Sequence, residues 1–208
     1  MRLRGRVVGF GLTGSHCTLA RAVAALKELV AEGAEVLPIL SPSVAQMATR
    51  FGRPEEWKER VKKLTGRDPL LSIAEVEPIG PRRSLDVMVV APCTGNTLAK
   101  LACAITDTPV VMACKAQLRN GRPVVLAVST NDGLGLNARN LGTLLAARNV
   151  YFVPFGQDNP EGKPCSLDAR LDLLVGTVEA ALEGRQLQPL LVERWRDLPP
   201  AAGEGGRR

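Results

Sequence analysis

Short hydrophobic runs alternate with helical patterns along the chain, and the first run ends in a glycine-rich turn. It begins at Val7 and reads V-V-G-F-G-L-T-G-S as far as Ser15. Over residues 15–32, apolar side chains recur at helical spacing: Leu19, Val23, Leu26 and Val30. Gly33 closes this helix, and a second run, Ala34–Leu40, follows at once. The pattern predicts a βαβ unit with a right-handed crossover.

Four later runs are continuous and apolar, which is typical of strands buried in a parallel sheet. They are Asp86–Ala91, Pro109–Ala113, Val124–Val128 and Val150–Val153. Residues 68–84 contain three prolines and no sustained period, so this segment is expected to be irregular, with one short strand at Leu70–Ile73. The chain is therefore predicted to be an α/β protein with a mostly parallel sheet of about six strands.

Helical patterns occupy most of the segments in between: Val44–Phe51, 54–64, Thr97–Ile105, Asn137–Arg148 and Ser166–Leu182, with Cys114–Asn120 either helical or a turn. Ser166 is a suitable cap for the last of these helices. The period is lost past Gly184. We therefore expect a single domain over residues 1–184 and a C-terminal tail over 185–208 that is irregular or bound to a partner.

Composition narrows the class of protein. Of the 208 residues 45% are hydrophobic and only 3% are aromatic, so the core must be built from Val, Leu, Ile and Ala. The formal net charge is +6, but scattered basic residues with few aromatics do not favour nucleic acid as a partner. No apolar stretch approaches the roughly 20 residues that cross a bilayer. Five cysteines without a C-x-x-C pair or a secretory signal favour reduced thiols in a cytoplasmic protein.

The glycine-rich turn is a candidate phosphate site. Gly9, Gly11 and Gly14 would let the backbone approach a ligand, and the helix that follows aims unpaired N–H groups at it. A dinucleotide fingerprint with this spacing also needs an acidic residue after the second strand, where this chain has Ser41 and Ser43. Hydroxyls at that place favour a mononucleotide phosphate over NAD. An ordinary turn, with glycines present only for packing, is the alternative.

Hydroxyl and amide side chains dominate the expected carboxyl ends of the strands, where ligands bind in open α/β sheets. The stretches are Thr13–Ser15, Ser41–Ser43, Pro92–Thr97, Ser129–Asp132 and Gln157–Asn159. They suit hydrogen bonding to a phosphate and a flat heterocycle. His16 is the single histidine, and no carboxylate pair has ligand spacing. A metal site is therefore not expected.

Longer motifs carry a family resemblance over residues 5 to about 184. They read G-L-T-G-S-H-C, A-P-C-T-G-N-T-L-A-K-L-A, I-T-D-T-P-V-V-M-A-C-K-A, L-R-N-G-R-P-V-V-L-A-V-S-T-N-D and Y-F-V-P-F-G-Q-D-N-P. In these motifs the chain resembles the B-subunit family of dipicolinate synthases. That family belongs to a flavoprotein superfamily with phosphopantothenoylcysteine decarboxylase and flavin prenyltransferase, whose shared motif P-x-x-x-N-T matches Pro92, Asn96 and Thr97.

The resemblance implies a Rossmann-like three-layer α/β/α fold, bound FMN and a homo-oligomer based on trimers. It also implies that the partner is the dehydrogenase-like A subunit of dipicolinate synthase, with NAD(P) bound there. The two proteins would act together as an oxidoreductase that converts dihydrodipicolinate, a small dicarboxylate, to dipicolinate during sporulation. The location would be the mother-cell cytoplasm of a spore-forming bacterium. The hydride could be accepted in this chain's own pocket or on the A subunit.

The resemblance also assigns surroundings to the flavin. Gly14, Ser15, Ser41 and Ser43 match residues around its phosphate, Pro92–Thr97 match the loop against the isoalloxazine, and the segment after the Val124–Val128 strand matches another wall. The candidate cofactor-binding residues are Gly11, Thr13, Gly14, Ser15, His16, Ser41, Ser43, Pro92, Cys93, Thr94, Gly95, Thr97, Ser129, Thr130, Asn131 and Asp132.

Asn96 is the candidate catalytic residue, because an amide can both donate to and accept from a ring; a loop-forming role is the alternative. Lys115, Arg119 and Arg122 form a basic cluster that suits the carboxylates of the substrate, or else a solvated surface. His16 either binds a ligand as a neutral imidazole, with its pKa lowered by the helix dipole, or is a capping or surface residue.

Two further residues have two interpretations each. Cys93 is either a reactive thiol or a packing residue. Asp132 either relays a proton or forms an Asx turn beside Gly133.

Two other functions are compatible with these residues. The chain could be a non-catalytic partner that stabilises or regulates the A subunit, or a stand-alone FMN-dependent decarboxylase or prenyltransferase. The decarboxylases place a histidine before the strand that matches Asp86–Ala91, where this chain has Glu77-Pro78-Ile79. Their reactive cysteine lies in an A-C-G flap, whereas Cys114 is followed by Lys115. Both departures count against decarboxylation.

Overall fold

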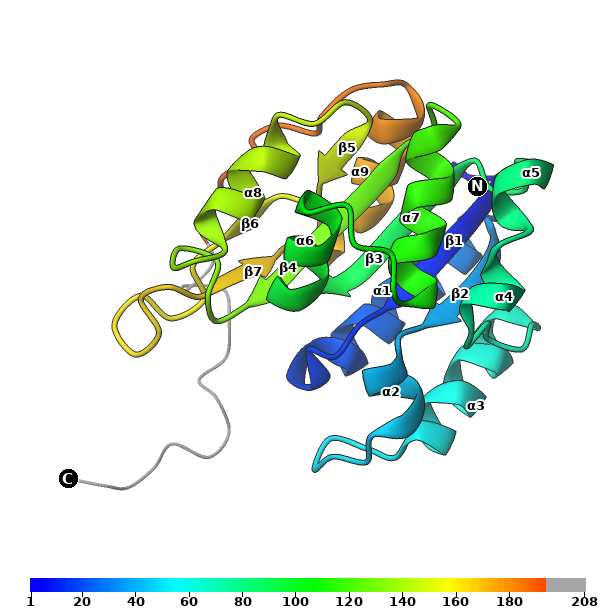
Figure 1. The fold of residues 1–208 in the computed structure, drawn as a ribbon, viewed down its shortest axis with the longest axis horizontal. Coiled ribbons are helices and arrows are strands. Elements are labelled where there is room, and N and C mark those ends of the chain that lie inside the picture. Colours follow the sequence, from blue (N-terminus) through cyan, green and yellow to red (C-terminus); the bar gives the residue numbers. More distant parts are fainter. Residues whose placement is uncertain (194–208) are drawn as a thin grey trace.

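The order of the strands in one sheet positions the rest of the molecule (Figure 1). In the computed structural model, which describes residues 1–193, the strands run β2 (Glu35–Leu40), β1 (Val7–Leu12), β3 (Val87–Cys93), β4 (Val124–Thr130), β7 (Leu167–Ala169) and β6 (Phe155–Gly156). β5 (Val150–Phe152) also pairs with β4. The pairs among β1 to β5 are parallel, whereas β7 is antiparallel to β4 and β6. The predicted mostly parallel sheet is confirmed, with seven strands in the described part of the chain.

Helices cover both faces of this sheet, which confirms the three-layer fold. One face is covered by α1 (Leu19–Ala31) and α9 (Leu174–Leu182), and the other by α6 (Gly95–Ala102), α7 (Pro109–Arg119) and α8 (Ala138–Leu145). The remaining helices are α2 (Pro42–Gln46), α3 (Pro54–Thr65), α4 (Ile73–Val76), α5 (Ile79–Arg82) and the 3₁₀ turns His16–Thr18 and Leu171–Leu173.

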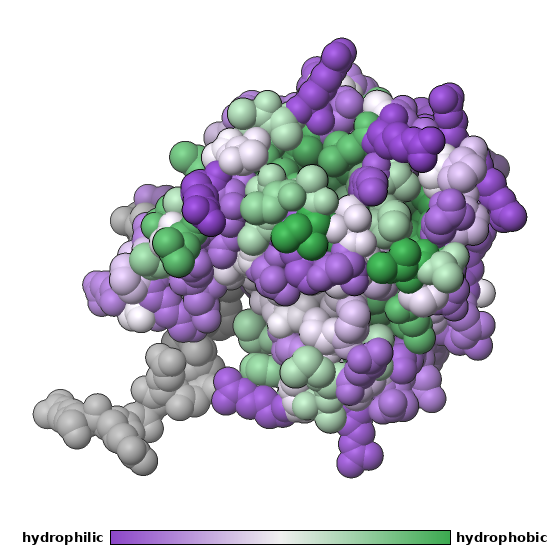
Figure 2. Space-filling view, in the orientation of Figure 1, coloured by the Kyte–Doolittle hydropathy of each residue, from purple (hydrophilic) through white to green (hydrophobic). Residues whose placement is uncertain are grey.

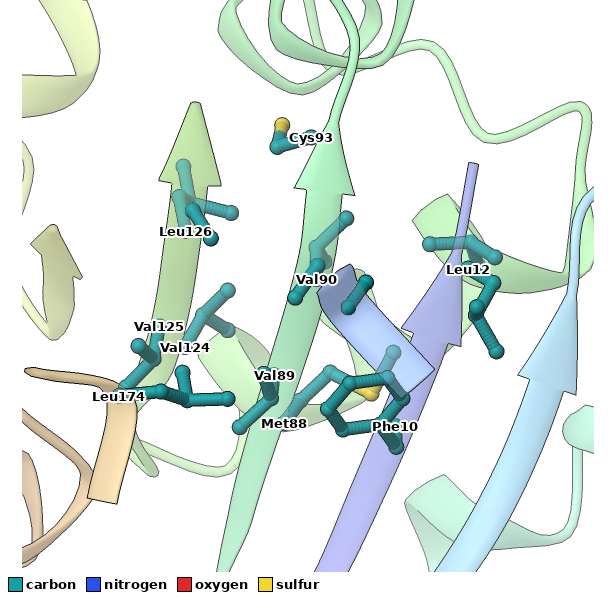
Figure 3. Close-up of a cluster of buried hydrophobic side chains, with 14 of the residues drawn as sticks. Phe10, Leu12, Met88, Val89, Val90, Cys93, Val124, Val125, Leu126 and Leu174 are labelled. Carbon is teal, nitrogen blue, oxygen red and sulfur yellow. The ribbon is translucent and has the colours of Figure 1, made fainter. Parts of the chain in front are cut away.

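The core lies against the central strands. Every residue of β3 is buried, as expected of a strand with helices on both faces. Figure 3 shows Met88, Val89 and Val90 of β3 between Phe10 of β1 and Leu126 of β4. The register of β3 against β4 shifts between Val90 and Cys93, so the end of β3 leaves the regular ladder just where the next loop begins.

The predicted strand Pro109–Ala113 is wrong, because these residues form the first turns of α7. Their β-branched, wholly apolar run suggested a strand, but the first five residues of this helix are largely buried, and its exposed polar side chains come only later, at Lys115 and Arg119. A helix signal was present in the sequence. Thr108 caps the helix by accepting from the N–H of Val111, and Pro109 occupies the first turn.

Three other predictions need correction. Ser166 caps no helix: residues 167–169 form β7 and the last helix begins only at Leu174. The short helix predicted over Val44–Phe51 spans Pro42–Gln46 instead. The segment 68–84 holds α4 and α5, and its predicted strand is reduced to one bridge between Leu70 and Ile39.

The described part of the predicted tail lies along the edge of the sheet. The side chain of Gln186 accepts from the N–H of Phe152 and donates to its carbonyl, and Leu191 bridges to Phe155. Residues 194–208 lie outside the described part of the chain. Within residues 1–193, no helix combines the length and the apolar character needed to cross a bilayer.

Gly11 lies inside β1 under two side chains, so it can be tested as a packing residue. A Cβ atom at this position would lie 2.8 Å from Met88 Cε and 2.8 Å from Val110 Cγ1. We expect Gly11→Ala to lower the free energy of unfolding by about 1–3 kcal/mol, measured by urea denaturation. Gly142 in α8 has open space around it, so Gly142→Ala should raise the same quantity by up to about 1 kcal/mol. Equal stability of the two variants would contradict this packing role.

Candidate functional site

The main cavity opens where the strand order reverses. The chain leaves β1 for α1 on one face of the sheet and leaves β3 for α6 on the other, and such a switch point forms a crevice beyond the carboxyl ends of the strands. A cavity of about 630 Å³ lies there, within the size range of small-molecule sites. Its lining residues are Thr13, Gly14, His16, Ser41, Pro42, Ser43, Met47, Thr94, Asn96, Thr97, Lys100, Asp107 and Thr108. We call it the switch-point cavity.

Thr13 ties the two sides of this cavity together. Its hydroxyl donates to the carbonyl of Pro92 at 2.6 Å and accepts from the N–H of Thr94 at 3.1 Å. The side chain is almost fully buried, with 1% exposure. Thr13 therefore lines the cavity but uses its hydroxyl to join the end of β1 to the loop after β3.

A second group of hydroxyls comes from the end of β2. The Oγ atoms of Ser41 and Ser43 lie 2.9 Å apart. A Cβ atom added to Gly14 would lie 2.6 Å from Ser43 Oγ, so only glycine lets the turn after β1 approach this pair. The predicted residues Gly14, Ser41 and Ser43 are thus brought together at one wall of the cavity, which we call the hydroxyl cradle.

The start of α6 forms the third wall. Thr94 caps the helix by accepting from the N–H of Thr97 at 3.2 Å. Asn96 is exposed and lines the cavity, which leaves its amide available to a ligand. Among the predicted residues of this loop, Thr94, Asn96 and Thr97 reach the cavity.

The fourth wall was missed by sequence reasoning. The Nζ atom of Lys100 lies 2.8 Å from both carboxylate oxygens of Asp107, and Thr108 stands next to that carboxylate in the chain. Hydrogen bonding to Lys100 lowers the pKa of Asp107. These residues escaped notice because the segment after them was predicted to be a strand, which hid the start of α7. The Thr-Pro pair at residues 108–109 was the available signal.

His16 brings the imidazole of the single histidine to the cavity wall. Its Nδ1 atom is buried and makes no hydrogen bond to any residue among 1–193, while the ring as a whole is half-buried at the cavity wall. Burial lowers the pKa of this group, because desolvation disfavours the charged imidazolium. The sequence predicted the same direction from the helix dipole, but desolvation is the cause here.

Four predicted residues line a separate hollow. Ser15, Ser129, Thr130 and Asn131 surround a cavity of about 350 Å³ together with residues of β7 and its loop. We call it the β4–β7 cavity. Ser15 Oγ lies 3.0 Å from Ser129 Oγ, which in turn lies 2.7 Å from Thr18 Oγ1. The consecutive residues Gly14 and Ser15 therefore face different hollows.

Other predicted cofactor residues line neither cavity. Gly11 packs under Met88 and Val110, and Cys93 is fully buried at the end of β3 (Figure 3). Burial raises the pKa of the Cys93 thiol to about 12, so this thiol is inert at neutral pH.

Three predicted cofactor-binding residues, Pro92, Gly95 and Asp132, make contacts within the protein at the loops that hold them. The carbonyl of Pro92 accepts the Thr13 bond, and a Cβ atom on Gly95 would lie 2.7 Å from Thr130 Oγ1. Asp132 accepts from the N–H of Leu136 at 3.1 Å and from the side chain of Asn137 at 3.0 Å. Its carboxylate therefore organises its own loop.

The predicted basic cluster does not form at either hollow. Lys115 and Arg119 lie on α7 beside a small apolar groove with Leu101 and Ile105. Arg122 precedes β4 at the opposite end of the sheet, where its guanidinium donates to the carbonyls of Arg83 and Leu85. The structure therefore gives these residues no contact with the candidate site.

Comparison with known proteins agrees with the fold. The chain belongs to the Flavoprotein family, whose model matches residues 2–163. Within it the chain is similar to the B subunit of dipicolinate synthase from Bacillus subtilis (strain 168), with 53% identity over 194 residues, 93% of this chain and 97% of the relative.

Two solved structures extend the comparison. One is the B subunit of dipicolinate synthase from Bacillus halodurans C, with a TM-score of 0.86 and 50% identity, covering 93% of this chain and 100% of that one. The other is the FMN-dependent cysteine decarboxylase TvaF from thioviridamide biosynthesis. It has a TM-score of 0.54 and 25% identity, covering 68% of this chain and 86% of that one.

The single histidine makes the desolvation of His16 measurable. We expect its Hε1 resonance to titrate with a midpoint below the ordinary pKa of about 6.5. The unfolded chain then binds a proton that the folded chain does not, so stability falls as the pH drops from about 7 through 6.5 towards the folded pKa. His16→Asn should lose this part of the pH dependence in urea denaturation. A midpoint above 6.5 would contradict a desolvated neutral imidazole.

Proposed function

We propose that this chain is the flavin-binding B subunit of a dipicolinate synthase. With a dehydrogenase-like A subunit that carries NAD(P), it oxidises dihydrodipicolinate to dipicolinate during sporulation. The observation that supports this best is the switch-point cavity. Its hydroxyl cradle lies at the β1/β3 crevice of a flavodoxin-like strand order, where FMN binds in that fold.

The donors of the cavity fit a phosphate monoester. Ser41, Ser43 and Gly14 lie together at one wall of the cavity, where the absence of a side chain on Gly14 leaves the two hydroxyls close to the turn after β1. Lys100 brings an ammonium to the wall, where it is paired with Asp107, and the start of α6 presents backbone N–H groups nearby. These are the groups that would hold the FMN phosphate in our proposal.

The remaining wall suits a flat heterocycle. The exposed amide of Asn96 can donate and accept at a ring edge, and the buried, unpartnered Nδ1 of His16 offers a further polar contact. A bound flavin would supply a two-electron acceptor. The role of this chain's residues is to bind and orient that group and to exclude water from it.

The proposal includes association of this chain with the A subunit and with further copies of itself. Leu134 and Leu136 on the loop before α8 expose 48% and 81% of their surface, which favours contact with the A subunit or with further copies in a trimer-based homo-oligomer. The place of action would be the mother-cell cytoplasm of a spore-forming bacterium. The reduced state that five unpaired cysteines favour supports this location.

A negative charge at the cradle should expel the phosphate. Ser43→Asp places a carboxylate against a phosphate dianion, and the repulsion should raise the Kd for FMN at least about a hundredfold. Quenching of FMN fluorescence on titration with the apoprotein measures this. Ser84→Asp carries the same charge change at the opposite end of the sheet and should keep the wild-type Kd. Unchanged FMN binding by Ser43→Asp would remove the phosphate from this cradle.

Asn96 should matter to the joint reaction and not to folding. In the presence of the A subunit, we expect Asn96→Ala to lower dipicolinate formation at least about tenfold, with unchanged flavin content and thermal midpoint. Asn96→Asp keeps the shape but loses the amide donors, so it should fail in the same way. Full activity of both variants would exclude Asn96. A colourless wild-type chain that takes up no flavin, yet accelerates the reaction of the A subunit, would favour the non-catalytic partner.

A further inference from the structure

The β4–β7 cavity is a second polar hollow, which lies next to the switch-point cavity at the turn after β1. Only the turn after β1 separates them, because Gly14 lines one and Ser15 the other. The smaller hollow is lined by Ser15, Cys17, Thr18, Arg21, Ser129, Thr130, Asn131, Asp158, Lys163, Ser166, Leu167 and Asp168. Its 350 Å³ is about half the volume of its neighbour, so it suits a smaller ligand.

Most charges of this hollow are already engaged. Arg21 donates to both carboxylate oxygens of Asp168, at 2.7 and 3.0 Å, and Asp168 is almost fully buried. Asp158 accepts from the hydroxyl of Ser166. Outside the ion pair of Arg21 and Asp168 the hollow holds two charged groups: the carboxylate of Asp158, and the ammonium of Lys163, which is exposed and forms no ion pair among residues 1–193.

The uncharged part of the wall offers several donors and acceptors. The Oγ atoms of Ser15 and Ser129 and the Oγ1 atom of Thr18 form a chain of contacts of 2.7 to 3.3 Å. The side chains of Thr130 and Asn131 lie beside it. Because hydroxyls can rotate to donate or accept, this wall can accommodate the oxygens and ring nitrogen of a small heteroaromatic acid.

We propose that the β4–β7 cavity binds the small dicarboxylate, with Lys163 pairing with one carboxylate and the wall of Ser15, Ser129 and Asn131 holding the rest. This inference rests on the proposed function for its choice of ligand. It separates two tasks: the cradle at Ser41 and Ser43 holds the phosphorylated cofactor, and the hollow behind the same turn holds the acid. The basic residues of α7 and Arg122 take no part.

Dipicolinate itself is the probe, used in metal-free buffer because this acid chelates divalent cations. Isothermal titration of the full chain with dipicolinate should show saturable binding. Lys163→Met should raise the Kd at least about tenfold, because a charge-assisted hydrogen bond is lost. Lys115→Met removes the same charge on a different face and should leave the Kd within about twofold of wild type.

Cysteine alkylation gives an independent readout. Cys17 lines the hollow and Cys103 does not, and both are exposed. Dipicolinate at ten times its Kd should slow alkylation of Cys17 about tenfold, followed by peptide mass spectrometry, while Cys103 keeps its rate. Lys163→Met should reduce this protection to about twofold or less at the same concentration.

The outcomes separate this inference from the proposed function. No binding of dipicolinate at millimolar concentration, an unchanged Kd in Lys163→Met, or equal protection of Cys17 and Cys103 would each overturn the acid site. Flavin content, read from visible absorbance of the same samples, tests the cofactor separately. Dipicolinate binding in a chain that takes up no flavin would support the acid site and contradict the flavin assignment.

Discussion

The hydroxyl of Thr13 holds together the two strand ends between which the switch-point cavity opens. Beyond their last ladder bonds, β1 and β3 must separate, since their chains continue to helices on opposite faces of the sheet. The Thr13 side chain is almost fully buried, and its hydroxyl bonds to the carbonyl of Pro92 and to the N–H of Thr94. The width of the crevice is therefore fixed by a core residue before any ligand arrives, which is the condition for a preorganised site.

Local patterning along the chain was enough to locate the strand ends. β1, β2, β3 and β4 were predicted within about two residues, because each is a short apolar run bounded by turn residues. The α7 segment was predicted wrongly because its first five residues are apolar and largely buried, so that its β-branched residues resemble a strand, while the exposed Lys115 and Arg119 come only in its second half. β7 failed because a three-residue strand before a helix leaves no period of its own.

Prediction of the candidate site from the sequence was limited in a different way. Sequence could place hydroxyls at strand ends, but it could not tell which hydroxyls are already used. Thr13 and Thr94 use theirs to join or cap elements of the fold, whereas Ser41 and Ser43 contact each other and line the switch-point cavity. Nor could it tell that neighbouring residues of one turn face two hollows. Figure 2 shows apolar surface over α6 and α7 bordered by polar side chains, and Lys115 and Arg119 belong to that region instead of the site.

The ion pair between Lys100 and Asp107 has a consequence for the loop that joins α6 to α7. The ammonium has three donors, so the phosphate proposed for this cavity would share it with Asp107. A contact between that phosphate and Lys100 would weaken the ion pair that holds residues 103–108 against α6. Binding in the crevice would in this way reach the beginning of α7, a helix whose far end lies on the opposite side of the molecule.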